Sequence, residues 1–176
     1  MRELRDEREA GYSLIEVMTV IGVVGIILAI AAPTIQNQIA VQEIRGAGRH
    51  VVEVLRDARD SAVNEGVPRY VLFDPAADPK TYRVFRYSAG NWVAEGPAVP
   101  LPDTVTFSAA DVTFPQLTNV PETGANVPED AAYFDTRGRY PFQQGAPSAY
   151  TVTLTGGAGR VVTLTVHRST GQVTGV

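Results

Sequence analysis

The residue that most needs a chemical explanation is Glu16, which stands at the start of a long apolar segment. No charged residue occurs from Val17 to Gln42, and the run from Val17 to Ile35 is almost wholly apolar (VMTVIGVVGIILAIAAPTI). An unpaired carboxylate that enters hydrocarbon costs about 3 kcal/mol on insertion scales, so it needs a partner. Because no basic residue follows within two helical turns, we expect that partner to come from another chain.

Catalytic and metal-binding patterns are absent from the sequence. His50 and His167 lack a metal-ligand spacing such as H-E-x-x-H, and there is no G-x-S-x-G elbow, P-loop or EF-hand spacing. The chain has no cysteine, which excludes thiolate chemistry, disulfides and Cys-based metal sites. The glycine turn Gly156–Gly159 leads into an expected strand, so it lacks the helix terminus that phosphate loops use. We therefore expect a non-catalytic protein without a cofactor or a metal site.

Two groups of charged residues leave a binding role open. Four arginines are candidates for a basic patch that binds nucleic acid: Arg137, Arg139, Arg160 and Arg168. A net charge of −4 and a sequence pI near 5.2 argue against general nucleic-acid binding, so ordinary solvated or strand-pairing arginines are the favoured alternative. Three acidic residues could contribute to a calcium site, although a merely solvated loop explains them as well: Glu122, Glu129 and Asp130.

The apolar segment that follows Glu16 is long enough to cross a bilayer, which takes about 20 helical residues. Three arginines precede it and none follows until Arg45, which predicts a cytoplasmic amino terminus with the rest of the chain outside. A buried core helix would be unusual with so long an uncharged run, and a secretory signal peptide has a shorter apolar region. A plain signal anchor fits the hydropathy but leaves Glu16 unexplained.

The helical pattern continues beyond the apolar segment. Apolar or small residues recur at three- and four-residue steps from Ile44 to Ala62, with charged residues between them, as in an amphipathic helix. The helix is expected to run from Tyr12 to near Asn64-Glu65-Gly66, where glycine supplies the C-cap, over about 80 Å. Pro33 removes a backbone donor and predicts a kink or local melting just before it.

The remainder of the chain is rich in Val, Tyr, Phe and Thr and predicts strands. The expected strands are Arg69–Asp74, Thr81–Tyr87, Asn91–Ala94, Val105–Ser108, Ala132–Asp135, Tyr150–Thr155, Arg160–Arg168 and Gln172–Thr174. Gly156–Gly159 is expected to join two of them as a hairpin turn. Residues 109–130 contain three prolines and no clear period, which predicts a long surface loop. The fold class is α+β, with a long amino-terminal helix packed on an antiparallel β-sheet or β-sandwich head.

The run Gly11-Tyr12-Ser13-Leu14-Ile15-Glu16-Val17 resembles the cleavage and methylation motif of type IV pilins and type II secretion pseudopilins. The resemblance implies that a prepilin peptidase cuts between Gly11 and Tyr12 and that Tyr12 becomes the N-methylated first residue. It also implies that Glu16 pairs with the amino terminus of a neighbouring subunit during assembly. Pro33 matches a helix-breaking proline of the family. Tyr12 replaces the usual Phe, and no basic residue directly precedes Gly11.

A long helix followed by a cysteine-free β head is similar to the H-type minor pseudopilins and the FimT-like minor pilins. The segments from Phe134 to Arg139 and from Arg168 to Val173 resemble the carboxy-terminal pattern of that group. FimT-like pilins that take up DNA carry a G-R-x-R pattern at the end of the chain. Here the corresponding residues are Gly171-Gln172-Val173-Thr174, which weakens the DNA-binding alternative.

The resemblance therefore implies a minor pseudopilin or minor pilin that assembles into, initiates or caps a filament. The implied parts are a cleaved leader, a transmembrane and filament-core helix, the amphipathic second half of that helix, and a β-rich head, at residues 1–11, 12–35, 36–66 and 67–176. The implied partners are other pilins or pseudopilins, the prepilin peptidase and an inner-membrane assembly platform. The implied location is the bacterial inner membrane, with the head in the periplasm, and then the filament.

Overall fold

The computed structural model describes residues 12–141 and 147–175. One long helix, α1 (Leu14–Glu65), opens this part of the chain. The chain divides into an amino-terminal unit that ends at Gln38 and a second unit from Ile39 to Val176, here called the head unit. The amino-terminal unit is helical from Leu14 onward, and an 18-residue window of α1 has a mean hydropathy of 2.6 with none of its residues buried. This helix is long and apolar enough to cross a membrane.

In the head unit, α1 buries one stripe of apolar side chains. Ile44, Val51, Leu55 and Ala62 are at most 2% exposed, and their spacing of seven, four and seven residues keeps them on one face of the helix. The helix ends at Glu65, and Gly66 follows with a φ of +65°, the left-handed conformation that terminates many helices. The predicted glycine cap is therefore confirmed.

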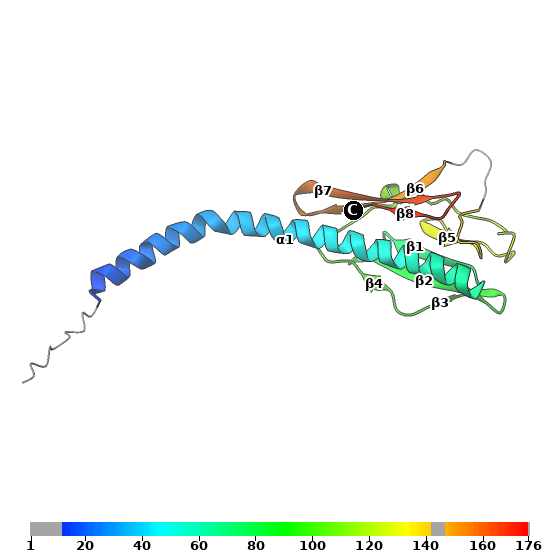
Figure 1. Cartoon of the computed structure of the whole chain (residues 1–176), viewed down its shortest axis with the longest axis horizontal. Coiled ribbons are helices and arrows are strands. Elements are labelled where there is room, and N and C mark those ends of the chain that lie inside the picture. The colour runs from blue at the N-terminus through cyan, green and yellow to red at the C-terminus, as the bar shows by residue number, and fades with distance from the viewer. Residues whose placement is uncertain (1–11, 142–146, 176) are drawn as a thin grey trace, which may run out of the picture. The chain divides into compact units, whose positions relative to one another are not determined.

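The rest of the head unit forms two antiparallel sheets (Figure 1). The first sheet has the order β3-β2-β1-β5, with β4 paired to β2, and the second has the order β6-β7-β8. The strands of the first sheet are β1 (Arg69–Asp74), β2 (Thr81–Ser88), β3 (Asn91–Ala94), β4 (Val99–Pro100) and β5 (Ala131–Phe134). The strands of the second sheet are β6 (Ala149–Gly156), β7 (Arg160–His167) and β8 (Val173–Thr174).

Alternation of side chains sets which face of each strand enters the core. In β6 every second residue is buried, so Tyr150, Val152 and Leu154 point inward while the intervening threonines do not. β7 places Leu164 and Val166 in the same layer. A short 3₁₀ turn, η2 (Gly157–Gly159), joins the two strands, so the hairpin expected there is confirmed. These side chains meet the apolar stripe of α1 in one core.

The segment 109–130 is irregular, as expected for a loop, but it does not lie wholly at the surface. Val112 bridges to Val152 of β6, Leu117 bridges to Val127, and a 3₁₀ turn, η1 (Ala109–Asp111), opens the segment. Five of its apolar residues are at most 5% exposed: Val112, Phe114, Leu117, Val120 and Val127. Phe114 packs against Phe73 of the first sheet and Tyr150 of the second. The buried side chains of the segment are irregularly spaced, which is why it shows no period.

One strand prediction was wrong, and one observed strand was not expected. Val105–Ser108 is not a strand, since only Thr106 forms an isolated bridge, to Thr155. Its Val105 and Phe107 are nevertheless buried, and core burial of these apolar residues produced the strand-like pattern. The two-residue strand β4 was not expected, because Pro100 and its neighbouring prolines are poor strand formers.

Candidate functional site

The amino-terminal segment begins with an exposed tyrosine and an immediate helix start. Tyr12 is 83% exposed, and α1 begins two residues later. The amide of Glu16 donates to the carbonyl of Ser13 at 3.0 Å, and the amide of Val17 donates to the same carbonyl at 3.2 Å. Glu16 thus lies in the first turn, where the helix dipole favours a carboxylate. Gly11, the expected cleavage residue, lies outside the described residues.

The side chain of Glu16 has no hydrogen-bond or ion-pair partner among residues 12–141 and 147–175. It borders a shallow notch of about 290 Å³ on the helix, together with Tyr12, Val17, Val20 and Ile21. The carboxylate and the residue expected to become the amino terminus therefore lie on the same apolar notch. The notch has no positive charge within the described chain to compensate the carboxylate.

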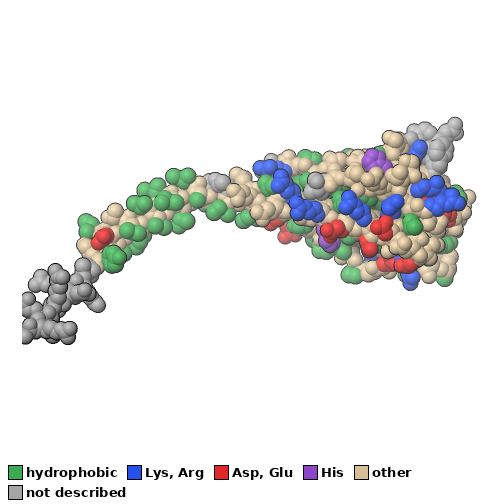
Figure 2. Space-filling view, viewed as in Figure 1, with side chains coloured by type: hydrophobic (Ala, Val, Ile, Leu, Met, Phe, Trp, Pro, Cys, Tyr) green, Lys and Arg blue, Asp and Glu red, His purple; other side chains and the backbone are tan. Residues whose placement is uncertain are grey.

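The surface around Glu16 is apolar over several helical turns. Leu14, Ile21 and Ile30 are between 66% and 80% exposed, and in Figure 2 hydrophobic side chains cover this length of helix. So large an apolar surface marks contact with lipid or with other protein chains. This is the environment in which an uncompensated carboxylate is costly.

The backbone of α1 keeps its helix assignment through Pro33. The structure shows no melted helical turn at this position, so the local melting that was expected as an alternative to a kink is not seen. The side chain of Pro33 lies outside what the structure describes, and the kink stays a prediction.

The structure brings three of the four candidate arginines together. Arg137 and Arg139 line a pocket of about 370 Å³, and Arg139 and Arg168 line an adjoining one of about 280 Å³ that shares Asp135 with it. Arg160 opens β7 while Arg168 follows its end, so the two lie about 26 Å apart along the strand. Asp135 forms an ion pair with Arg139 at 3.4 Å, which reduces the positive charge of the cluster.

The two motifs that contain these arginines are held together by backbone contacts. Asp135 Oδ1 accepts the amides of Arg137 and Arg139, which forms a tight turn with Gly138 at a φ of +70°. The amide of Tyr140 then donates to the carbonyl of Arg168 at 3.2 Å. Residues 134–139 and 168–173, some 30 positions apart in sequence, therefore form one structural unit.

Two arginines of α1 fasten this unit to the helix, and the sequence analysis did not identify their role. Arg59 Nε lies 3.2 Å from the carbonyl oxygens of both Gly138 and Thr170, and Arg56 donates to the carbonyl of Val173 at 3.0 Å. Both arginines stand beside the apolar stripe of the helix. Their position next to the buried face is the sequence feature that could have indicated contacts with the sheet.

The acidic residues considered for calcium do not converge. Glu122 accepts hydrogen bonds from the amide and the hydroxyl of Thr136. Burial and the neighbouring Glu129 raise the pKa of Asp130. Within the described residues there is no group of three or more His, Cys, Asp or Glu side chains that could hold a metal ion.

The histidines contact polar groups of the head unit. His50 Nδ1 is hydrogen-bonded to the hydroxyl of Tyr82, whose pKa is raised to about 12 by burial. His167 Nε2 lies 3.5 Å from the hydroxyl of Thr174. Each histidine thus has a local partner within its own fold.

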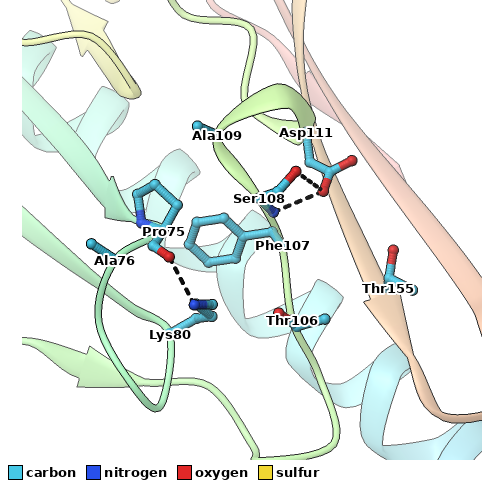
Figure 3. A pocket seen from close by; sticks show the side chains of 9 residues that line it. All are labelled: Pro75, Ala76, Lys80, Thr106, Phe107, Ser108, Ala109, Asp111 and Thr155. Atoms are coloured by element: carbon cyan, nitrogen blue, oxygen red, sulfur yellow. Dashed lines mark hydrogen bonds between the residues drawn. The ribbon is translucent and has the colours of Figure 1, made fainter.

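Another pocket, of about 560 Å³, opens between the loop after β1 and the segment 106–111 (Figure 3). The ammonium of Lys80 donates to the carbonyl of Pro75 at 2.7 Å. The carboxylate of Asp111 accepts from both the amide and the hydroxyl of Ser108 at 2.8 Å. Because these charged groups are bonded to their own neighbours and not aimed at a common point, we assign no chemistry to this pocket.

Comparisons with known proteins bear on both ends of the chain. A family model described as the prokaryotic N-terminal methylation motif matches residues 7–32. A search of curated proteins finds no match to the chain. Among solved structures, the chain is similar to the minor pseudopilin EpsH from the Type 2 Secretion System of Vibrio cholerae, with 11% identity and a TM-score of 0.52. The match covers 76% of this chain and 96% of that one.

These findings confirm two of the expectations. The methylation motif matches the segment that contains Gly11, Tyr12 and Glu16, and with the long apolar helix it indicates membrane anchoring. The structural likeness shows a shared fold, in which one long helix precedes antiparallel sheets. The α+β, pilin-like fold class is therefore confirmed.

Proposed function

We propose that this chain, which has the methylation motif and the pilin-like fold of the type IV pilin and pseudopilin family, is a minor filament subunit. It has a structural, non-catalytic role: it is anchored in the membrane and then assembles into, initiates or caps a pseudopilus or pilus. The observation that carries the proposal is Glu16, a carboxylate in the first turn of an exposed apolar helix that has no partner among the residues that the structure describes.

The proposed assembly contact joins two chains through opposite charges. Cleavage after Gly11 would give Tyr12 a new amino terminus, which is methylated and stays positively charged. Glu16 of an incoming subunit pairs with this terminus on a neighbour, and each group removes the desolvation cost of the other. Since the pair forms at one axial position only, it sets the register between subunits more than it stabilises the filament.

The proposed processing requires further partners. A prepilin peptidase removes residues 1–11, and an inner-membrane assembly platform moves the subunit from the bilayer into the filament. Residues 12–35 form the membrane and filament-core helix, residues 36–66 its amphipathic second half, and residues 67–176 the β-rich remainder. The excess of arginine before the apolar segment supports a cytoplasmic amino terminus and an external head.

Replacing Glu16 with alanine tests the proposal. We expect Glu16→Ala to be cleaved and N-methylated as the parent is, but to be lost from sheared filaments or from filament-dependent secretion. The matched control is Thr19→Ala, one turn further along, whose hydroxyl bonds only to the carbonyl of Ile15 within the described chain. Normal incorporation of Glu16→Ala would overturn the proposed role of this carboxylate.

Mass spectrometry of the mature amino terminus separates a filament subunit from an unprocessed membrane-anchored β domain. We expect N-methyl-Tyr12 at the first position when the chain is isolated from membranes of cells with an active peptidase. A chain that still begins at Met1 would support the simple anchor and contradict the proposal.

A DNA-binding subunit at a pilus tip is a second candidate, favoured by the gathering of Arg137, Arg139 and Arg168 around adjoining pockets. The Asp135 ion pair and the residues Gln172 and Val173 weigh against it. Gel-shift measurements across salt concentrations test it, since phosphate contacts are strongest at low salt. No shift at low salt would remove this candidate, whereas a shift abolished by Arg137→Ala with Arg168→Ala would support it.

A further inference from the structure

The second half of α1 carries its charges in two separate stripes. At 100° per residue, Arg45, Arg49, Arg56 and Arg59 fall within about 80° of the helix circumference. Acidic residues occupy the adjoining stripe, farther from the buried face. In Figure 2 Lys and Arg side chains follow one another along this part of the molecule, with Asp and Glu side chains beside them. The stripes are a property of the head unit, whose buried helix face lies on the other side of the arginines.

Some charged residues of these stripes form hydrogen bonds or ion pairs within the chain, and others have no such partner among the described residues. Arg56 and Arg59 bond to backbone carbonyls of the head unit. By contrast, Arg45 and Arg49 are exposed and have no hydrogen-bond or ion-pair partner in the described part of the chain. The same holds for Glu53 and Asp57 on the acidic stripe. Two cations and two anions thus remain on the exposed face of a single helix.

These four charged residues match in sign when a second copy of the helix is shifted by one particular distance along the axis. Arg45 and Arg49 are spaced four residues apart, as are Glu53 and Asp57, and the second pair lies eight residues after the first. Eight residues correspond to about 12 Å along a helix. A parallel second copy that is shifted by this distance places its basic pair level with the acidic pair of the first. Both pairs then match at once.

We propose that Arg45 and Arg49 of one copy pair with Glu53 and Asp57 of a second copy of this chain, side by side and shifted by about 12 Å. The parallel alignment rests on the proposed function, because both copies are anchored through the same end. Such a contact joins different surfaces of the two copies, so it does not close on itself. Exposed ion pairs contribute little affinity, so this contact selects the neighbour and its register.

Cross-linking of the full-length chain in membranes tests the register. The chain has no cysteine, so introduced thiols are its only ones. Two differently tagged copies, one with Arg49→Cys and the other with Asp57→Cys, keep the Arg45–Glu53 pair intact. We expect about fivefold more oxidised mixed dimer from this combination than from Arg45→Cys with Asp57→Cys. In the proposed register position 49 lies level with position 57, whereas position 45 lies four residues away from that level. Equal yields from both combinations would overturn the proposed register.

Charge reversal tests whether complementarity is the cause. Arg45→Glu with Arg49→Glu makes both stripes acidic, and Glu53→Arg with Asp57→Arg makes both basic, so each variant alone should lose co-purification of differently tagged copies. Mixing the two variants restores opposite charges at every contact, and co-purification should return. The control is Arg160→Glu, the same kind of charge change at an exposed arginine outside α1. Failure of the mixture to recover would contradict the proposal.

The outcomes separate this inference from the proposed function. If the subunit enters filaments but the 49–57 cross-link is absent, the function stands and the second-copy contact is wrong. If Asp57→Cys cross-links instead to a different pilin-like chain, the occupant is not a second copy and the inference falls. If Tyr12 is never methylated and no filament contains the chain, the proposed function itself fails.

Discussion

Two glycines from separate motifs approach each other more closely than any side chain would permit. A Cβ atom built on Gly171 would lie 1.7 Å from the carbonyl oxygen of Gly138 and 3.0 Å from Nε of Arg59. Both glycines also have a positive φ, at +64° and +70°. The contact allows the Arg59 guanidinium to reach the carbonyls of both turns. The Arg59 guanidinium therefore joins the two turns, at Gly138 and at Thr170, to the helix.

Gly171→Ala is expected to destabilise the head strongly. The backbone conformation alone costs about 1 kcal/mol for alanine, and the clash with the Gly138 carbonyl raises the total above about 3 kcal/mol. The matched control is Gly159→Ala, with a φ of +68° and no atom within 4 Å of its added Cβ. Urea denaturation followed by circular dichroism gives both free energies. Equal losses for the two variants would refute the close contact.

At the scale of elements, the end of α1 is tied to the first sheet through a buried cation. Arg69 of β1 is 3% exposed and lies 2.6 Å from Glu65 at the end of the helix and 3.0 Å from Glu95 just after β3. Desolvation alone would lower the pKa of Arg69, but the hydrogen bonds to Glu95 and Glu65 outweigh it and raise the pKa. The guanidinium therefore fixes the helix terminus to two strands.

Removing Glu95 is expected to cost more stability than removing Glu65. Glu95 offers both carboxylate oxygens to Arg69 and is 27% exposed, whereas Glu65 makes one bond and is 52% exposed. Glu95→Ala leaves a buried charge poorly compensated and should lower the free energy of unfolding by about 3 kcal/mol, against about 1 kcal/mol for Glu65→Ala. Thermal or urea unfolding of the two variants would show the order, and the reverse order would be inconsistent with this clamp.

Most elements of the head could be predicted from local pattern, because each has a period of its own. The predicted Arg69–Asp74 and Asn91–Ala94 have the bounds of β1 and β3, and the alternation in β6 and β7 identified the hairpin. Segment 109–130 could not be predicted in this way. Its side chains are buried by contacts with strands far away in sequence, such as Val112 with Val152, and not by any repeat within the segment.

The candidate site also has features that follow from a local sequence pattern and features that depend on tertiary contacts. The motif that contains Gly11, Tyr12 and Glu16 could be recognised because it is short and local, and the family model matches the same segment. The roles of these three residues stay predictions. The clustering of Arg139 with Arg168, apart from Arg160, depends on how two turns meet in space. The anchoring roles of Arg56 and Arg59 depend on the same tertiary contact. No local pattern in the sequence indicates such tertiary contacts.

At the scale of the whole molecule, buried tyrosines make the head unit sensitive to alkaline pH. Burial raises the pKa of Tyr70 and of Tyr82 to about 12, above the ordinary value of about 10. The folded state therefore holds these hydroxyls neutral while the unfolded chain ionises them. Their contribution to stability is complete below about pH 10 and is lost as the pH rises from about 10 to about 12.

We expect the urea midpoint of the full chain in detergent to fall steeply between about pH 10 and about pH 12. Trp92, the single tryptophan, packs against Tyr70 and reports unfolding by its fluorescence. Tyr82→Phe removes one of the titrating hydroxyls, so its midpoint should fall less over this interval than that of the parent. An identical fall in the variant would mean that Tyr82 does not contribute to the alkaline transition.

The boundary between the two units at Gln38 has a consequence for how deep the chain can sit in a bilayer. The roughly 25 residues from Leu14 to Gln38 correspond to about 38 Å of helix, against a hydrocarbon core of about 30 Å. Beyond Gln38 the chain is committed to a folded head whose charged surface cannot follow the helix into lipid. If the chain is anchored as proposed, the difference of about 8 Å between these two lengths limits how far the helix can shift along the membrane normal. In the proposed membrane-anchored subunit, each copy would therefore hold its Glu16 at nearly the same depth before two subunits meet.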